Sequence, residues 1–74
     1  MPRKKEQGLT NCIRDLRTAA SGMTQQDLAD QVGVTRQTIV ALEGGDYTPS
    51  LTLALRIARV FGKPTDEVFQ LEQG

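Results

Sequence analysis

The fold of this chain is decided by residues 24–43, TQQDLADQVGVTRQTIVALE. Before and after a central glycine, apolar residues follow the i, i+3, i+4 spacing of buried helix faces: Leu28, Ala29, Val32, Ile39 and Leu42. Gly33 interrupts the pattern, and a tight turn needs one residue at positive φ, which glycine adopts without steric cost. The spacing of the small residue, the glycine and the later β-branched residue predicts two helices joined as a helix-turn-helix.

The second of these helices is expected to turn a different set of side chains outward. These are Arg36, Gln37, Val40 and Ala41. Arginine can form two hydrogen bonds with the edge of guanine, and glutamine with the edge of adenine. An ordinary solvated helix face has a similar composition, but the turn in front of this helix favours the reading of DNA bases.

Length and composition predict one small helical domain. A chain of 74 residues buries only a modest core, and with three aromatic residues that core is built mainly from aliphatic side chains. No apolar run is long enough to span a membrane. The first residues, MPRKKEQG, lack the apolar stretch of a signal peptide. We therefore expect a cytoplasmic protein without membrane contacts.

The reactive side chains needed for most catalysis are missing from the sequence. Cys12 is the single cysteine and there is no histidine, so an internal disulfide, a Cys-x-x-Cys metal site and histidine-assisted nucleophiles are excluded. Cys12 is either a redox-sensitive thiol or an ordinary helix residue. The sequence predicts no enzyme activity, no metal, no cofactor and no small-molecule ligand.

The charges balance over the whole chain but are unevenly distributed. The formal net charge is zero, which predicts weak non-specific binding to DNA phosphates. Arg3, Lys4 and Lys5 gather in residues 1–8, which we interpret as a flexible basic tail. Such a tail can follow a phosphate backbone or enter a groove, or it can simply keep the terminus soluble.

Three further helices are expected around the helix-turn-helix. The first spans residues 9–20, with Thr10 or Asn11 as its cap; the others span residues 51–61 and 65–71. Thr24 and Asp27 are spaced as a capping box for the second helix, and Thr35 can cap the third. The domain itself is assigned to residues 9–74.

The 51–61 helix is apolar on more than one side. Its expected core face consists of Leu51, Ala54, Leu55, Ala58 and Phe61. Leu53 and Val60 are then placed on the other side, as ordinary surface residues or as a dimer contact. Phe69 and Leu71 either close the core or extend that dimer surface.

Three pieces of the chain together resemble the Cro/cI phage-repressor family, also called XRE-like: TQQDLADQVGVTRQTIVALEGG, YTPSLTLALRIARVFG and DEVF. The similarity covers about residues 11–69 and is strongest to short, free-standing prokaryotic members. It implies an all-α, compact, five-helix lambda-repressor-like DNA-binding domain with the helix-turn-helix at its second and third helices.

The resemblance also implies roles for individual residues. Arg36, Gln37 and Ala41 match base-reading positions, and Val40 lies on the same predicted face. Phosphate contacts are implied for Gln25, Thr35, Thr38 and the backbone N–H groups at Gly44 and Gly45. A structural ion pair is implied between Arg17 and Glu43. In this chain, Asp46 stands where many members carry a basic residue, and one extra residue separates Arg17 from Gly22.

Two functions are compatible with these features. The first is a sequence-specific transcriptional regulator, a repressor, that binds a two-fold related DNA operator as a homodimer with its third helix in the major groove. The second is a protein-interaction module or antitoxin-type partner protein that uses the surface of the last two helices. Arg36 and Gln37 favour the first, whereas the zero net charge and Asp46 favour the second.

Overall fold

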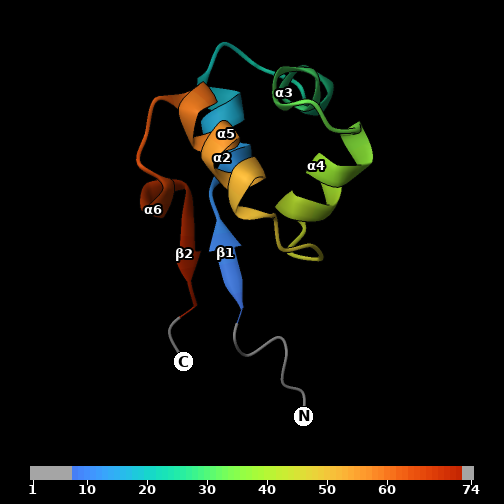
Figure 1. The fold of residues 1–74 in the computed structure, drawn as a ribbon. Coiled ribbons are helices and arrows are strands. Elements are labelled where there is room, and N and C mark those ends of the chain that lie inside the picture. Colours follow the sequence, from blue (N-terminus) through green and yellow to red (C-terminus); the bar gives the residue numbers. More distant parts are fainter. Residues whose placement is uncertain (1–7, 73–74) are drawn as a thin grey trace.

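The structure, a computed structural model, describes residues 8–72, in which five helices lie beside a small two-stranded sheet (Figure 1). The elements are β1 (Leu9–Asn11), α2 (Ile13–Ala19), α3 (Gln25–Val32), α4 (Arg36–Glu43), α5 (Leu51–Phe61), α6 (Thr65–Val68) and β2 (Phe69–Leu71). The predicted five helices and the helix-turn-helix, which is formed by α3 and α4, are confirmed. The sheet was not predicted.

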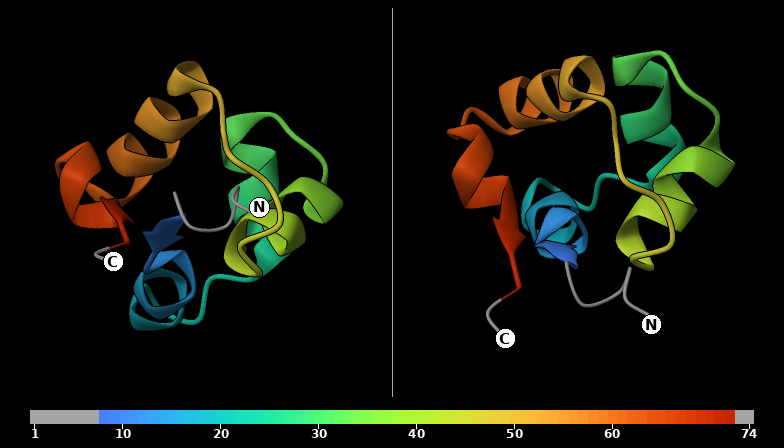
Figure 2. Two further views of the ribbon diagram at one scale, coloured as in Figure 1. Left: turned by 90° about the horizontal axis from the view of Figure 1, so that it is seen from below. Right: turned by 60° about the horizontal axis from the view of Figure 1, so that its bottom comes forward.

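The sheet joins the two ends of the described chain. β1 and β2 pair antiparallel with Leu9 opposite Leu71 and Asn11 opposite Phe69, and Figures 1 and 2 show the two strands side by side. The expected helices over residues 9–20 and 65–71 were therefore wrong at these ends. Each strand satisfies its backbone groups through a partner far away in the sequence, which a local apolar pattern does not reveal.

Asn11 connects the end of β1 with the start of α2. Its Oδ1 accepts a hydrogen bond from the Ile13 N–H at 3.1 Å, and its Nδ2 donates to the Leu42 carbonyl at 2.9 Å. Asn11 thus satisfies a free N–H in the first turn, as expected of a cap, although the residue directly before the helix is Cys12. The Cys12 Sγ lies 3.2 Å from the Glu67 carbonyl oxygen.

A bulged turn accommodates the extra residue after Arg17. α2 ends at Ala19, and Ser21 and Gly22 follow at φ 59° and 74°. The Arg17 carbonyl accepts from both the Ala20 and the Met23 N–H groups at 3.0 and 3.1 Å. The chain therefore turns early instead of lengthening the helix.

The helix-turn-helix has the capping that its sequence predicts. Thr24 and Asp27 form a reciprocal capping box, with both hydrogen bonds at 3.0 Å. Gly33 ends α3 at φ 78°, in the left-handed region. The Thr35 hydroxyl caps α4 by accepting from the Thr38 N–H at 3.3 Å. These local signals fix the directions in which the two helices leave the turn.

One hydrophobic core holds the helices and the sheet together. It consists of Ile13, Leu28, Ala29, Val32, Ile39, Leu42, Leu53, Ala54, Ile57, Ala58, Val68 and Phe69. α4 packs on α3, which also packs on α5, so that α4 lies at one side of the molecule (Figure 2). Its outer face is therefore free. None of the helices within residues 8–72 has the length and apolar character needed to cross a membrane.

The orientation of α5 differs from the expected one. Leu53 is 7% exposed, whereas Leu51 and Leu55 are 71% and 50% exposed. The expectation that Leu51 and Leu55 face the core and Leu53 faces outward was therefore wrong. Ala54 and Ala58 are buried as predicted. Apolar residues at eight of eleven positions satisfy the helical repeat in two overlapping ways, so the repeat alone does not fix which face is buried.

Candidate nucleic-acid interface

The outer face of α4 carries the four residues proposed to read bases. Arg36 and Gln37 are exposed in the first turn, Val40 is 42% exposed one turn later, and Ala41 is half-buried. Ile39 and Leu42 are buried on the opposite side. α4 thus presents two long polar side chains and a small apolar surface, a combination suited to base edges and thymine methyl groups.

The first turn of α4 also gathers hydroxyl groups. The Thr35 and Thr38 hydroxyl oxygens lie 3.2 Å apart, and Thr35 is exposed. Both residues stand at the positive end of the helix dipole, where an anion is favoured. This position suits contact with a DNA phosphate.

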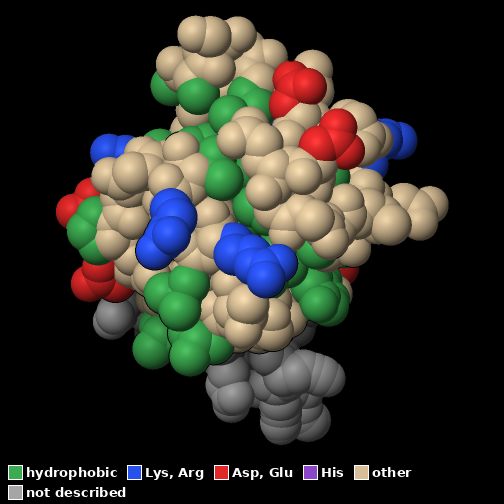
Figure 3. Space-filling view, turned by 45° about the horizontal axis from the view of Figure 1, so that its top comes forward, with side chains coloured by type: hydrophobic (Ala, Val, Ile, Leu, Met, Phe, Trp, Pro, Cys, Tyr) green, Lys and Arg blue, Asp and Glu red, His purple; other side chains and the backbone are tan. Residues whose placement is uncertain are grey.

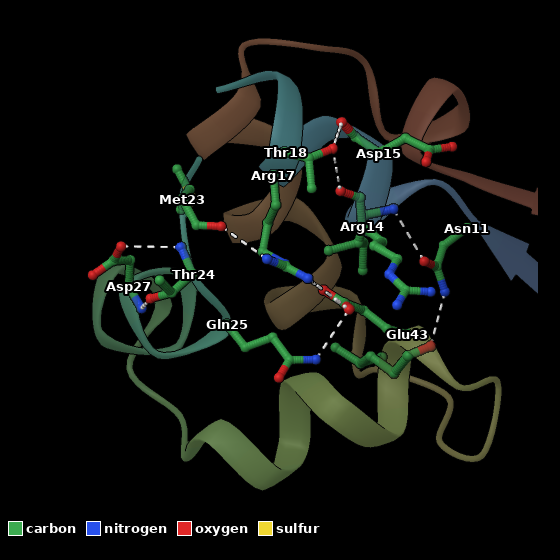
Figure 4. Close-up of polar contacts among 12 residues, drawn as sticks. Asn11, Arg14, Asp15, Arg17, Thr18, Met23, Thr24, Gln25, Asp27 and Glu43 are labelled. Atoms are coloured by element: carbon green, nitrogen blue, oxygen red, sulfur yellow. Dashed lines mark hydrogen bonds and ion pairs between the residues drawn. The ribbon is translucent and has the colours of Figure 1, made fainter. Parts of the chain in front are cut away.

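Gln25 links the two ends of α4. From the start of α3, its Nε2 donates to Glu43 Oε1 at 3.1 Å, as Figure 4 shows. Its Oε1 accepts from Arg36 Nη1 at 3.2 Å. Because Arg36 is the first residue of α4 and Glu43 the last, one side chain of α3 holds both ends of that helix.

The ion pair implied by the family resemblance is present. Arg17 Nε and Nη2 donate to the two carboxylate oxygens of Glu43 at 2.6 and 3.0 Å (Figure 4). The two side chains are only 10% and 8% exposed. Arg17 Nη1 donates to the Met23 carbonyl at 2.8 Å. The pair therefore ties α2 to the end of α4 and to the loop before α3.

These contacts keep Glu43 ionised. Burial raises the pKa of Glu43, but the hydrogen bonds from Arg17 and Gln25 and the nearby positive charges of Arg17 and Arg14 together bring it below its usual range. The same hydrogen bond with Glu43 raises the pKa of Arg17, against the effect of burial. The pKa of Asp27 is lowered by its hydrogen bonds with Thr24.

The turn after α4 uses backbone groups that were expected to hold phosphate. The N–H of Gly44 donates to the Val40 carbonyl at 3.0 Å, and the N–H of Gly45 donates to the Leu42 carbonyl at 3.1 Å. The Asp46 N–H donates to the Ala41 carbonyl at 2.9 Å. These hydrogen bonds close the end of the helix. They argue against Gly44 and Gly45 as phosphate donors.

Arg14 is a further candidate for a phosphate contact that was not predicted from the sequence. It lines an open cleft of about 360 Å³ between the end of α2 and the start of α3, together with Arg17, Thr18, Gly22, Met23, Thr24 and Gln25. Arg14 is exposed, and its charge acts on Glu43. Its position three residues before Arg17 on one helix was the available signal, because residues three apart share a helix face.

The residues expected to form a dimer surface do not lie together on the outside. Leu53 and Phe69 are in the core, Val60 is half-buried, and Leu71 is 72% exposed. The expected dimer contact is therefore corrected for Leu53, which the packing of α5 encloses. Of the two roles expected for Phe69, closing the core is confirmed and the dimer surface is not.

A different set of large apolar side chains is exposed instead. Leu51 and Leu55 lie one turn apart on α5, and Tyr47 is 47% exposed in the loop before this helix. Arg56 and Arg59 are the exposed basic residues of the same helix. Figure 3 shows hydrophobic and basic side chains next to each other on one face of the molecule.

Two points remain, the expected basic tail and metal binding. Arg3, Lys4 and Lys5 lie outside the described residues. Within residues 8–72, no three side chains of cysteine, aspartate or glutamate come together in a way that could hold a metal ion.

Comparison with known proteins gives a consistent assignment. The helix-turn-helix family matches residues 13–68. A Bacillus subtilis protein named uncharacterized HTH-type transcriptional regulator YgzD is 48% identical over 65 residues, which cover 88% of this chain and 97% of that protein. An uncharacterized HTH-type transcriptional regulator of Methanothermobacter thermautotrophicus is 57% identical over 53 residues, which cover 70% of this chain and 77% of that one.

A solved structure shares both fold and sequence. The restriction-modification controller protein C.AhdI from Aeromonas hydrophila superimposes with a TM-score of 0.67 at 33% identity, covering 74% of this chain and 82% of that one. The chain belongs to the Cro/cI-type (XRE-like) helix-turn-helix family.

Proposed function

We propose that this protein is a sequence-specific DNA-binding transcriptional regulator that inserts α4 into the major groove. The observation that carries the proposal is the exposed pair Arg36 and Gln37 in the first turn of α4, a helix whose two ends are held by Gln25. These two residue types read guanine and adenine edges through paired hydrogen bonds. Because both ends of the helix are held, the backbone that carries these two side chains does not have to be ordered on binding, which lowers the cost of association.

Phosphate contacts on both sides of this helix would position it in the groove. We assign them to Gln25, Thr35 and Thr38, with Arg14 added from the structure. Gln25 Nε2 uses one N–H for Glu43, which leaves its second N–H for a phosphate oxygen. We propose repression as the outcome, because it requires only that the bound protein occupies the promoter.

We further propose that the protein acts as a homodimer on a two-fold related operator. Each paired base contact contributes about 1–3 kcal/mol of discrimination, so one small domain with few such contacts binds weakly alone. Two linked domains combine their half-sites about one helical turn apart. Leu51, Leu55 and Tyr47 are the exposed apolar residues that we assign to the contact between protomers.

Selection from random double-stranded DNA, followed by fluorescence anisotropy at two salt concentrations, tests DNA reading. We expect the wild-type protein to enrich a two-fold related sequence. Arg36→Ala should weaken the preference at one base pair by roughly 5- to 150-fold, the equivalent of about 1–3 kcal/mol. Gln37→Ala should do so at a neighbouring base pair.

Lys63→Ala is the control, because it removes one positive charge from the exposed turn after α5. It should leave the base preference intact. If Arg36→Ala weakens binding to all sequences equally, Arg36 contacts only phosphate. If the wild-type protein enriches no sequence, the protein-interaction function becomes the better explanation.

Sedimentation analysis across a concentration range tests the dimer surface. Leu51→Ser and Leu55→Ser should shift the protein toward the monomer. Leu71→Ser is the matched control, because Leu71 and Leu51 are equally exposed, at 72% and 71%, but lie on β2 and α5. A monomer–dimer equilibrium that responds to Leu71→Ser alone would place the contact at the sheet instead.

A further inference from the structure

We propose that Glu43 is a positioning residue for base reading, because it fixes the Gln25 amide that holds Arg36. This inference rests on the proposed function. It gives the buried ion pair a second role besides holding the helices together. The connection runs from Arg17 through Glu43 and Gln25 to Arg36, and every step in it is a hydrogen bond of 3.2 Å or less.

The chemistry of the two neighbours permits one orientation of the Gln25 amide. A carboxylate only accepts hydrogen bonds and a guanidinium only donates them. The amide nitrogen must therefore face Glu43, and the amide oxygen must face Arg36. The hydrogen bonds of 3.1 Å to Glu43 and 3.2 Å from Arg36 agree with this orientation. A glutamine between less polar neighbours could turn its amide over with little change in packing.

Glu43 is a firm anchor for this orientation. Its two oxygens are held by Arg17, and its side chain is only 8% exposed. Oε1 accepts from Arg17 Nη2 and from Gln25 Nε2 together. The carboxylate that accepts the hydrogen bond from Gln25 thus cannot change its position without breaking a buried ion pair.

The hydrogen bond to Gln25 restricts the Arg36 side chain before DNA is bound. Arg36 is exposed, and a long exposed arginine ordinarily samples many rotamers. The Gln25 oxygen engages Nη1 and leaves the remaining guanidinium N–H groups for a base edge. Restricting the side chain before binding favours the one base that this position can reach, and it lowers the entropy lost on binding.

The test uses a double-mutant cycle of Glu43→Gln and Gln25→Met. The measured quantity is a ratio of two affinities. The first is the affinity for the selected operator. The second is the affinity for the same operator with one base pair changed, namely the base pair at which Arg36→Ala loses its preference. Gln25→Met keeps the length of the side chain and removes both hydrogen bonds. We expect each single variant to lower the ratio about three- to tenfold, and the double variant to lower it no further than Gln25→Met alone.

Ile57→Val is the matched control. Ile57 is fully buried on α5, outside the connection from Arg17 to Arg36, so stability should fall while the affinity ratio stays near the wild-type value. Equal effects of Glu43→Gln with and without Gln25→Met would overturn the proposal, because a purely structural residue acts independently of Gln25.

A measurement on the DNA-free protein separates this inference from the proposed function. Nitrogen-15 relaxation of the Arg36 Nε–H should show a more mobile side chain in Gln25→Met and Glu43→Gln, and an unchanged one in Ile57→Val. Equal mobility in all four proteins would overturn the link whatever the DNA results. Altered mobility in a protein that selects no DNA sequence would overturn the reading role together with the proposed function, while leaving the hydrogen-bond link itself supported.

Discussion

Gly33 is under the strictest backbone requirement in the helix-turn-helix. Its φ is 78°, and an added Cβ would meet only Arg56 Nη1, at an ordinary 3.8 Å. Conformation, and not space, therefore excludes other residues there. Gly33→Ala should lower the free energy of unfolding by about 1 kcal/mol. Gly33→Asn should lower it less, because asparagine tolerates the left-handed region.

Urea unfolding of the three proteins gives these differences. A loss for asparagine as large as the loss for alanine would mean that contact with Arg56 matters more than backbone conformation.

The positive φ at Gly33 and the caps at Thr24 and Thr35 were predictable from sequence, because each depends on neighbours within a few residues. The cleft beside Arg14 was not, because it forms only where α2 meets α3.

At the scale of the elements, α5 offers a matched pair of substitutions. Leu53→Ala should lower the free energy of unfolding by about 2–5 kcal/mol, because it leaves a cavity in the core. Leu55→Ala should lower it by less than about 1 kcal/mol in the monomer, because that side chain is half exposed. Denaturant unfolding at a protein concentration that keeps the chain monomeric measures both. The reverse order would contradict the observed orientation of α5.

Local sequence signals predicted the helices well only where they have clear ends. The bounds of α5 agree with those expected, since Ser50 and Gly62 mark its two ends, but its buried face was predicted incorrectly. β1 and the end of α6 were misjudged for a related reason. Which apolar face is buried, and whether an end pairs as a strand, depend on partners that only the folded chain brings near.

At the scale of the whole molecule, acid should destabilise the protein because it protonates the hydrogen-bonded carboxylates of Glu43 and Asp27. The pKa values of Glu43 and Asp27 are lower in the folded chain than their usual values, so the unfolded chain binds more protons in that range. Stability should therefore be full near neutral pH and should fall as the pH drops below about 4, through the lowered values. Thermal unfolding from pH 7 to pH 2 measures this loss.

Glu43→Gln should reduce the pH dependence of stability. Glu72→Gln removes the same charge from an exposed residue and separates this effect from the change in net charge. An unaltered slope in Glu43→Gln would mean that other carboxylates control acid unfolding. The exposed position of the outer face of α4 followed from the sequence. The exposed apolar face did not, because it depends on how the whole chain packs.

The pairing of β1 with β2 has a consequence for the order in which the chain can be connected. Thr10 and Gln70 are 60 residues apart, and the Glu72 N–H donates to the Gly8 carbonyl at 2.9 Å. In the natural order, this sheet closes a loop that contains nearly the whole domain, which is the slowest kind of contact to form. A circular permutant that joins residue 72 to residue 8 through a short linker, and opens between α4 and α5, would make this contact local. It would reach the same core by a faster folding route.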